Sequence, residues 1–268
     1  MTSLTIPYYH VDSFTNVVFT GNPAGICILD NFPPDSVLQN IAGENRHSQT
    51  AFVMPRADGD FNLRWFSPVI EDELCGHATL AAAHVLVLRK HETWPVKFHT
   101  RSGILTVSRQ QELYEMDFPI WPAQICENAP SFLLEALGIE KALVMITPRD
   151  FMVVVESSSQ VEALTPDIKS LASLEDNRGV IVTAPGIDDV DYVARYFAPS
   201  IGIDEDPVTG SINCSMAPYW ADRLGKTSLR VQQLSRRGGQ MRCVIAGDRV
   251  LISGTAHLYF SGTIMLDV

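Results

Sequence analysis

Three consecutive residues, Cys75, Gly76 and His77, place a thiol and an imidazole where a polar turn meets an apolar segment. That segment is apolar nearly all round, which is typical of a helix buried inside a core. The start of a helix presents free backbone N–H groups and the positive end of the helix dipole, so it attracts anions. It also favours the thiolate form of a cysteine. We therefore interpret this turn as one edge of an active site.

A second turn of the same kind follows 131 residues later. The segment RWFSP, which begins at Arg64, is matched by RYFAP, which begins at Arg195, and each leads into an acidic turn and a helix of small residues. The same offset pairs Cys75 with Asp206. We interpret the match as an internal duplication. It predicts two similar lobes whose turns face each other across a ligand-binding cleft.

Two helix starts that face one cleft would hold a carboxylate through their backbone N–H groups. The small residues of the second turn permit close approach of the backbone and add hydroxyl donors: Thr209, Gly210 and Ser211. Around the bound anion, Cys75 and His77 on one side and Asp206 on the other could donate or accept protons. The reaction class that follows is proton transfer beside a carboxylate, as in racemisation, epimerisation or double-bond isomerisation.

Each of these residues also has a purely structural interpretation. Cys75 could be a packed thiol, and His77 could hydrogen-bond to the backbone at the helix start. Asp206 could cap the second helix, because Pro207 would suit the first helical position. His84 lies two turns deeper in the first helix and is expected to be a core histidine with a hydrogen-bond partner.

The hydrophobic pattern places the elements that would position the two turns. An N-cap at Ser131 and a terminating Gly138 are expected for one helix. A change of pattern with two prolines puts a domain boundary near residues 118–130. The remaining expectations are a helix at 35–44, strands at 50–54, 94–100, 103–109 and 113–118, and one or two short helices within 162–174.

The composition excludes several classes of protein. The chain has 268 residues, 46% of them hydrophobic and 19% charged, as in ordinary soluble globular proteins. Its net charge of −11 argues against nucleic-acid binding. No run approaches about 18 apolar residues, and no secretory leader is evident, which argues against a membrane partner. Five cysteines without a CxxC pair favour free thiols in the cytoplasm. The common metal, nucleotide and nicotinamide motifs are missing, so no metal ligand is predicted.

Four segments, FTGNPAGI, RWFSPVIEDELCGHATLAAAHVL, DEDPVTGSINCSMAPYW and LSRRGG, resemble those of the phenazine-biosynthesis PhzF-like proteins, in the diaminopimelate epimerase-like superfamily. They lie in order over residues 14–239 and are specific together. The resemblance implies an α+β fold of two pseudo-symmetric lobes, each a mixed β-barrel around a central helix. One lobe would span residues 1–118 with a returning strand near 257–268, and the other residues 119–256.

The resemblance also implies an isomerase that needs neither cofactor nor metal and is often a homodimer. The best-studied member of the family isomerises a dihydro-hydroxyanthranilate by proton transfer. The expected partner here is a small carboxylate-containing metabolite bound between the lobes. Asn22 and Gly76 join the second turn as expected substrate-binding residues, and the expected catalytic positions are Gln49, Cys75, His77 and Asp206.

One position departs from the family. The family acid/base is typically a Glu in an SETxF segment, and this chain has SQTAF with Gln49 in its place. An amide does not exchange protons at ordinary pH, so Gln49 could only orient a substrate. The protein could be an isomerase for another substrate, using Cys75, His77 or Asp206. Glu44 could replace the missing Glu from five residues upstream. Alternatively, the protein could bind a small carboxylate without turning it over.

An unrelated thiol enzyme is a further hypothesis, with Cys75 as nucleophile and His77 as base. Residues two apart at a helix start need not face each other, so the sequence leaves this pairing open.

Overall fold

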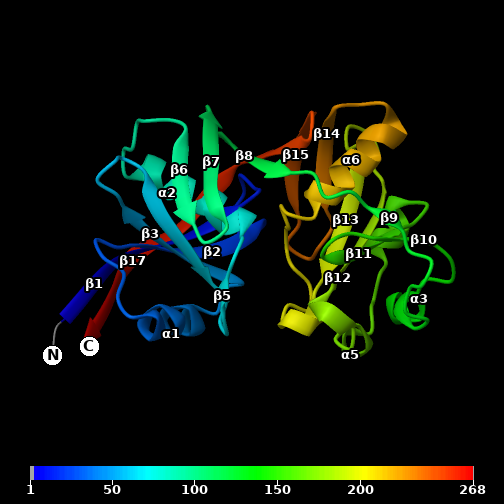
Figure 1. Ribbon diagram of the computed structural model, residues 1–268, viewed down its shortest axis with the longest axis horizontal. Helices are drawn as coiled ribbons and strands as arrows, with labels where there is room; N and C mark the ends of the chain where they lie inside the picture. The colour runs from blue at the N-terminus through cyan, green and yellow to red at the C-terminus, as the bar shows by residue number, and fades with distance from the viewer. Residues whose placement is uncertain (1–2, 268) are drawn as a thin grey trace. The chain divides into compact units, whose positions relative to one another are not determined.

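The computed structural model describes residues 3–267. The chain forms two compact units. The first unit comprises Met1–Asp117 and Ser253–Val268, and the second unit comprises Phe118–Ile252. Each unit contains a mixed sheet and a few helices, so the chain has a mixed α/β fold (Figure 1).

The first unit is built on strands that pair in the order β17, β1, β2, β3, β4, β6, β7, β8, with the two-residue β5 paired to β4. The bounds are β1 Ser3–Ser13, β2 Asn22–Ile28, β3 Gln49–Pro55, β4 Phe61–Phe66, β5 Glu71–Asp72, β6 Val96–Thr100, β7 Gly103–Gln110, β8 Leu113–Pro119 and β17 Ala256–Asp267. Two helices complete the unit, α1 Asp35–Asn45 and α2 Gly76–Leu88.

The second unit pairs its strands in the order β9, β10, β11, β12, β13, β14, β15. The strands are β9 Gln124–Ile125, β10 Leu143–Ile146, β11 Asp150–Val154, β12 Gly179–Pro185, β13 Tyr192–Phe197, β14 Ser228–Gln233, β15 Gly239–Ala246 and β16 Arg249–Gly254. The helices are α3 Leu133–Leu137, α4 Ser158–Glu162, α5 Ile168–Leu171 and α6 Asn213–Leu224, with short 3₁₀ turns η1 Glu175–Asn177 and η2 Pro199–Ile201.

The two units repeat the same series of strand directions. From β1 through β2, β3, β4 and β6 to β7 the pairings are antiparallel, parallel, antiparallel, parallel and antiparallel. From β10 through β11, β12, β13 and β14 to β15 the series is identical. Strands β4 and β13, which carry the two matching segments, begin 131 residues apart, at Phe61 and Tyr192. The duplication expected from the sequence is therefore present in the strand order.

Helix α2 lies in the core of the first unit, packed against β1, β2, β3 and β17. Ten of its residues are buried, on every side of the helix, because the segment is almost wholly apolar. In the second unit a core cluster joins residues of β11, β12 and β13 to the short helices. Among the helices of residues 3–267, none is both long and apolar enough to cross a membrane.

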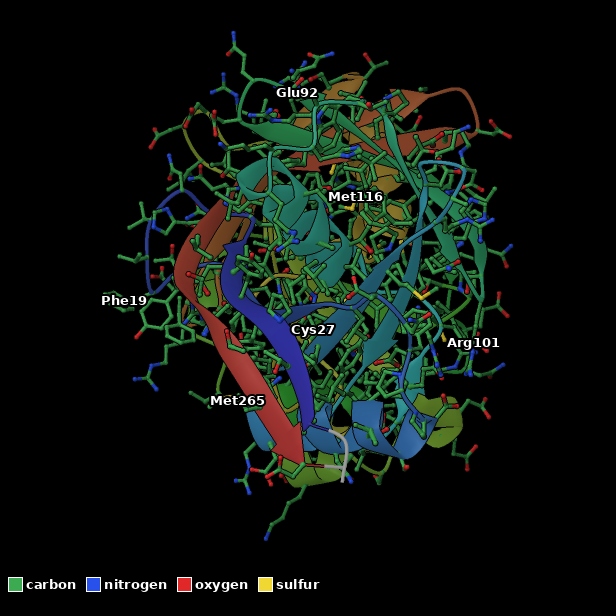
Figure 2. All side chains as sticks on the ribbon, turned by 90° about the vertical axis from the view of Figure 1, so that its left-hand side faces the viewer. Phe19, Cys27, Glu92, Arg101, Met116 and Met265 are labelled. Carbon is green, nitrogen blue, oxygen red and sulfur yellow. The ribbon has the colours of Figure 1, made fainter. Side chains whose placement is uncertain are left out.

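The last strand pairs with the first. Strand β17 runs antiparallel to β1, from Ser3 opposite Asp267 to Ser13 opposite Ala256, with one register shift beside His10. Figures 1 and 2 show the two strands side by side. The C-terminal segment thus completes the sheet of the first unit after the chain has formed the second.

Most predicted elements are found close to their expected bounds, but one cap is not. The helix expected over residues 131–138 is the shorter α3, and its N-cap is Phe132 rather than Ser131. Residues 130–133 first form a turn, with the N–H of Leu133 bonded to the carbonyl of Pro130. Gly138 ends the helix in the left-handed region, as predicted, with φ of 70°.

Candidate active site

The start of α2 is held rigidly by hydroxyl groups. Cys75 is the N-cap residue in an extended conformation, and its carbonyl accepts a hydrogen bond from the Thr79 hydroxyl at 2.6 Å. The carbonyl of His77 accepts one from the Ser13 hydroxyl of β1 at 2.7 Å. All four residues are buried. The predicted helix start at Cys75–His77 is therefore confirmed, and its geometry is fixed by neighbouring strands.

The imidazole of His77 sits between a thiol and a hydroxyl. Its Nδ1 lies 3.4 Å from the Sγ of Cys75, and its Nε2 lies 3.2 Å from the Oγ of Ser48. Ser48 in turn donates to the Oδ1 of Asn22 at 3.2 Å. Because Ser48 has only one proton, this donation leaves its oxygen to accept from His77 Nε2. His77 Nδ1 is then the acceptor that faces the Cys75 thiol.

His77 is neutral in the folded protein. Burial is the main cause that lowers its pKa to about 3, and the nearby His47 lowers it further. A neutral imidazole acts as one donor and one acceptor, in agreement with the hydrogen bonds to Ser48 and Cys75. The sequence left open whether Cys75 and His77 face each other, and the structure shows that they do.

Gln49 begins β3 and its side chain is directed to a carboxylate. Its Nε2 donates a short hydrogen bond to the Oδ2 of Asp72. Its carbonyl Oε1 is buried and has no hydrogen-bond partner in the structure. The register explains the first contact: Asp72 pairs with Trp65, and Trp65 pairs with Ala51, two residues from Gln49 on the same face of the sheet. Gln49 is 6% exposed.

The second turn is organised by one buried glutamine. Gln233, at the end of β14, accepts from the backbone N–H of Thr209 at 2.8 Å and donates to the carbonyl of Asp206 at 2.7 Å. The Thr209 hydroxyl donates to Asp206 Oδ2 at 2.5 Å. Asp206 and Thr209 are both buried. Gly210 accepts a hydrogen bond from Asn213 Nδ2 at 3.1 Å.

Asp206 does not cap the second helix. Helix α6 begins at Asn213, and its N-cap is Ile212. The helix starts Gly76 and Asn213 are 137 residues apart, whereas strands β4 and β13 are 131 apart, so the turn of the second repeat is longer. The helix-capping interpretation of Asp206 is therefore wrong. Residues 209–211 form a loop before α6 rather than its first turn.

The arginines of the two matching segments have the same role in each unit. Arg64 Nε donates to Glu71 Oε1 at 2.7 Å, and Arg195 Nε donates to Glu205 Oε1 at 2.6 Å. Each guanidinium also lies over the phenylalanine two residues further along its strand, 5.1 Å from the ring centre in the first unit and 5.0 Å in the second. The repeated arginine thus ties the acidic turn to the strand before it.

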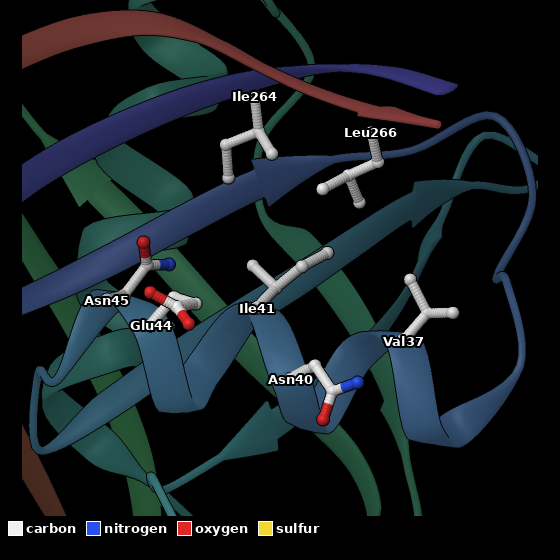
Figure 3. Close-up of a pocket in the computed structure, with 7 residues that line it drawn as sticks. All are labelled: Val37, Asn40, Ile41, Glu44, Asn45, Ile264 and Leu266. Atoms are coloured by element: carbon white, nitrogen blue, oxygen red, sulfur yellow. The ribbon is translucent and has the colours of Figure 1, made fainter. Parts of the chain in front are cut away.

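Two other expectations concern residues of the first unit. His84 lies 3.0 Å from the hydroxyl of Tyr114, and burial is the main cause that lowers its pKa to about 4, so it is a core histidine as predicted. Glu44, in the last turn of α1, lines a pocket of about 340 Å³ with the apolar side chains of Ile264 and Leu266 (Figure 3). That position argues against Glu44 as the substitute for the family Glu.

A group of three possible metal ligands occurs at the turn between β3 and β4 and on β6: Asp58, Asp60 and His99. Asp58 is ion-paired with Arg56 at 3.0 Å, so a positive charge already occupies its neighbourhood. None of the predicted site residues belongs to this group.

The structure thus places the predicted residues in two sets. Around the start of α2 in the first unit are Asn22, Gln49, Cys75, Gly76 and His77. In the loop before α6 in the second unit are Asp206, Thr209, Gly210 and Ser211.

Comparison with known proteins agrees with this arrangement. The family model described as phenazine biosynthesis-like protein matches residues 11–262. The chain belongs to the phenazine biosynthesis-like family. An uncharacterized isomerase of Pseudomonas aeruginosa is 48% identical over 264 residues, which are 98% of this chain and all of that protein.

Solved structures of the phenazine biosynthesis-like family share the fold. A PhzF-family protein of Enterococcus faecalis, 41% identical, superposes with a TM-score of 0.93 and covers 98% of this chain and all of that one. A hydroxyproline epimerase of Agrobacterium vitis, 12% identical, has a TM-score of 0.65 over 98% of this chain and 93% of its own, which shows that it shares the fold.

Three residues around the site were not among those predicted: Ser48, Asp72 and Gln233. Ser48 lies beside the predicted Gln49, and alternation in β3 gave no reason to direct it to His77. Gln233 lies 24 residues after Thr209, and only the parallel pairing of β13 with β14 brings it near. Asp72 had a visible signal, the dipeptide Glu-Asp that recurs as Glu205–Asp206.

Proposed function

We propose that this protein is an isomerase that moves a proton on a small carboxylate substrate, without a metal or an organic cofactor. The observation that carries the proposal is the buried series Cys75, His77, Ser48 at the start of α2. A neutral imidazole between two groups that can each give or take a proton suits acid–base chemistry. The free backbone N–H groups of the same helix start suit a carboxylate.

We propose that the substrate lies between the two units, in contact with the turn at residues 75–77 and the loop at residues 206–211. Support comes from the duplication, because equivalent turns in the two units each present a buried acid–base group. Relatives named as isomerases support the reaction class. We also propose that the protein acts as a homodimer in the cytoplasm, as the family resemblance implies.

Solvent-deuterium incorporation tests the proposal. The purified protein is incubated in D₂O with dihydro-hydroxyanthranilate, L-proline, trans-4-hydroxy-L-proline, L-alanine and L-glutamate in turn, and mass gain is followed by mass spectrometry. We expect exchange at a carbon-bound position of at least one compound, lost when His77→Asn replaces the imidazole. Heat-denatured protein is the control. Absence of exchange from every compound, with a folded protein, contradicts the proposal.

A second candidate function is ligand binding without turnover. Gln49 favours it, because the amide at the family's acid/base position cannot carry a proton. Titration calorimetry with the same five compounds separates the two functions. A compound that binds tightly and shows no deuterium exchange over several days identifies a binding protein.

A further inference from the structure

Asp72 in the first unit is the structural equivalent of Asp206 in the second. Asp72 pairs with Trp65 across β5 and β4, and the backbone N–H of Asp206 bonds to the carbonyl of Tyr196 at 3.0 Å. Trp65 and Tyr196 are themselves equivalent, since both are the second residue of the repeated segment, 131 residues apart.

The ion pairs confirm this alignment. Glu71 immediately precedes Asp72 and is held by Arg64, while Glu205 immediately precedes Asp206 and is held by Arg195. From the arginines to these acidic pairs the offset grows from 131 to 134, because the second turn contains three more residues. The partner of Asp206 in the first repeat is therefore Asp72, not Cys75 as the constant offset indicated.

Each of the two aspartates receives a hydrogen bond from an uncharged side chain. Asp206 accepts from the Thr209 hydroxyl, and Asp72 accepts from the Gln49 amide. Both arrangements orient a carboxylate without neutralising it, in contrast to Glu71, whose two oxygens are occupied by Arg64. Glu71 also contacts Arg101 at 2.7 Å.

We propose that Asp72 is the proton carrier of the first unit, and that Gln49 is a positioning residue that holds the Asp72 carboxylate where other family members have a glutamate. The inference rests on the proposed isomerase function. Asp72 is half-buried, and the carboxylate thus supplies the titratable group that Gln49 lacks. The unpartnered Gln49 Oε1 indicates that the substrate brings a donor, a hydroxyl or an amine, to the same place.

The proton transfer balances within the substrate and one side chain. The Asp72 carboxylate removes a proton from a carbon next to the substrate's carboxylate or double bond. The electron pair of the broken C–H bond passes into that conjugated group. The protonated Asp72 then gives its proton to a second carbon, or to the same carbon after exchange with solvent, and no oxidant or co-reactant is required.

The decisive variant is Asp72→Asn, whose Oδ1 can still accept from Gln49. In the deuterium-exchange assay, with the compound that the wild type exchanges fastest, we expect kcat to fall at least 100-fold. Glu73→Gln, at the exposed neighbouring position, is the matched control and is expected to stay within twofold of the wild type. In the double variant Gln49→Glu with Asp72→Asn, we expect at least tenfold recovery over Asp72→Asn.

Gln49→Met tests the positioning role and serves if Asp72→Asn does not fold. Loss of the amide donor disfavours the carboxylate form, so the acidic limb of the kcat profile should move about one unit to higher pH. If the wild type exchanges a compound and Asp72→Asn keeps a kcat within threefold, or Gln49→Met leaves the profile in place, the role of Asp72 is overturned while the isomerase function stands. If the wild type exchanges none of the compounds, both are overturned.

Discussion

His77 Nε2 lies 3.2 Å from the hydroxyl of Ser48, inside a core that keeps the imidazole uncharged. The hydrogen bond gives the buried ring a partner that needs no charge. It also fixes which nitrogen faces Cys75. Protonation of the ring would require the site to open, because the buried surroundings disfavour the charged form.

The first prediction follows from that burial. The folded-state pKa of His77 is lowered to about 3, below its ordinary value, so the unfolded state binds more protons below about pH 6.5. Stability is therefore complete above that pH and falls as the pH decreases. Between pH 7 and 5 the loss due to His77 is about 2 kcal/mol. Urea unfolding across this range measures it, and His77→Gln should flatten the slope.

His84→Gln is the control for the first prediction, because the pKa of His84 is also lowered, to about 4, and it lies outside the site. Its replacement should flatten the same slope without affecting proton exchange. A His77→Gln slope equal to that of the wild type would contradict the neutral state of the buried ring.

The second prediction concerns the repeated arginine. Arg64 and Glu71 are mostly buried, with side chains 16% and 10% exposed. Arg64→Met leaves the Glu71 carboxylate with only the exposed Arg101, so we expect a loss of about 2–4 kcal/mol in unfolding free energy. Arg56→Met is the matched control, because Arg56 and Asp58 are 34% and 49% exposed, and it should cost less than about 1 kcal/mol. Equal losses for the two variants would show that burial does not decide the effect.

The third prediction concerns Gln233, which holds the loop that carries Asp206. Gln233→Ala removes two buried hydrogen bonds, and the orphaned Thr209 N–H and Asp206 carbonyl should cost about 2–3 kcal/mol together. The looser loop should also lower kcat for deuterium exchange. Gln240→Ala, at an exposed position on β15, should change unfolding by less than about 0.5 kcal/mol. A wild-type melting temperature for Gln233→Ala would refute this role.

The fourth prediction separates proton transfer from thiol catalysis. Three thiols are buried with raised pKa values, Cys27, Cys214 and Cys243, and burial is the largest cause in each case. Iodoacetamide should therefore modify the half-buried Cys126 first, as peptide mass spectrometry can show. Cys75 should react no faster than Cys126, because the neutral His77 beside it is a poor proton acceptor. Rapid labelling of Cys75 that depends on His77 would instead favour a nucleophilic thiol.

Local patterns predicted most of the elements, because the periodicity of apolar residues and the turn residues act over short distances. The helix at α2 and the strands around it were placed close to their final bounds. The contact between Gln49 and Asp72 could not be predicted in this way. It joins residues 23 apart and depends on the register of three strands, which no single segment determines.

The equivalent of Asp206 was misplaced for a related reason. A constant offset assumes that a duplicated segment keeps its length, and turns gain and lose residues more readily than strands do. The ion pairs Arg64–Glu71 and Arg195–Glu205 restore the alignment, since they mark the same point of the fold in both copies.

The pairing of β1 with β17 also sets an order for folding during synthesis. The second unit is complete once residue 252 has left the ribosome, whereas the first unit still lacks one of its strands. Until β17 arrives, one edge of β1 is unpaired, and an unpaired strand edge is a site for association with other chains. The half of the molecule that is translated first is thus the half that is finished last, and the start of α2 acquires its final surroundings only when the chain is released.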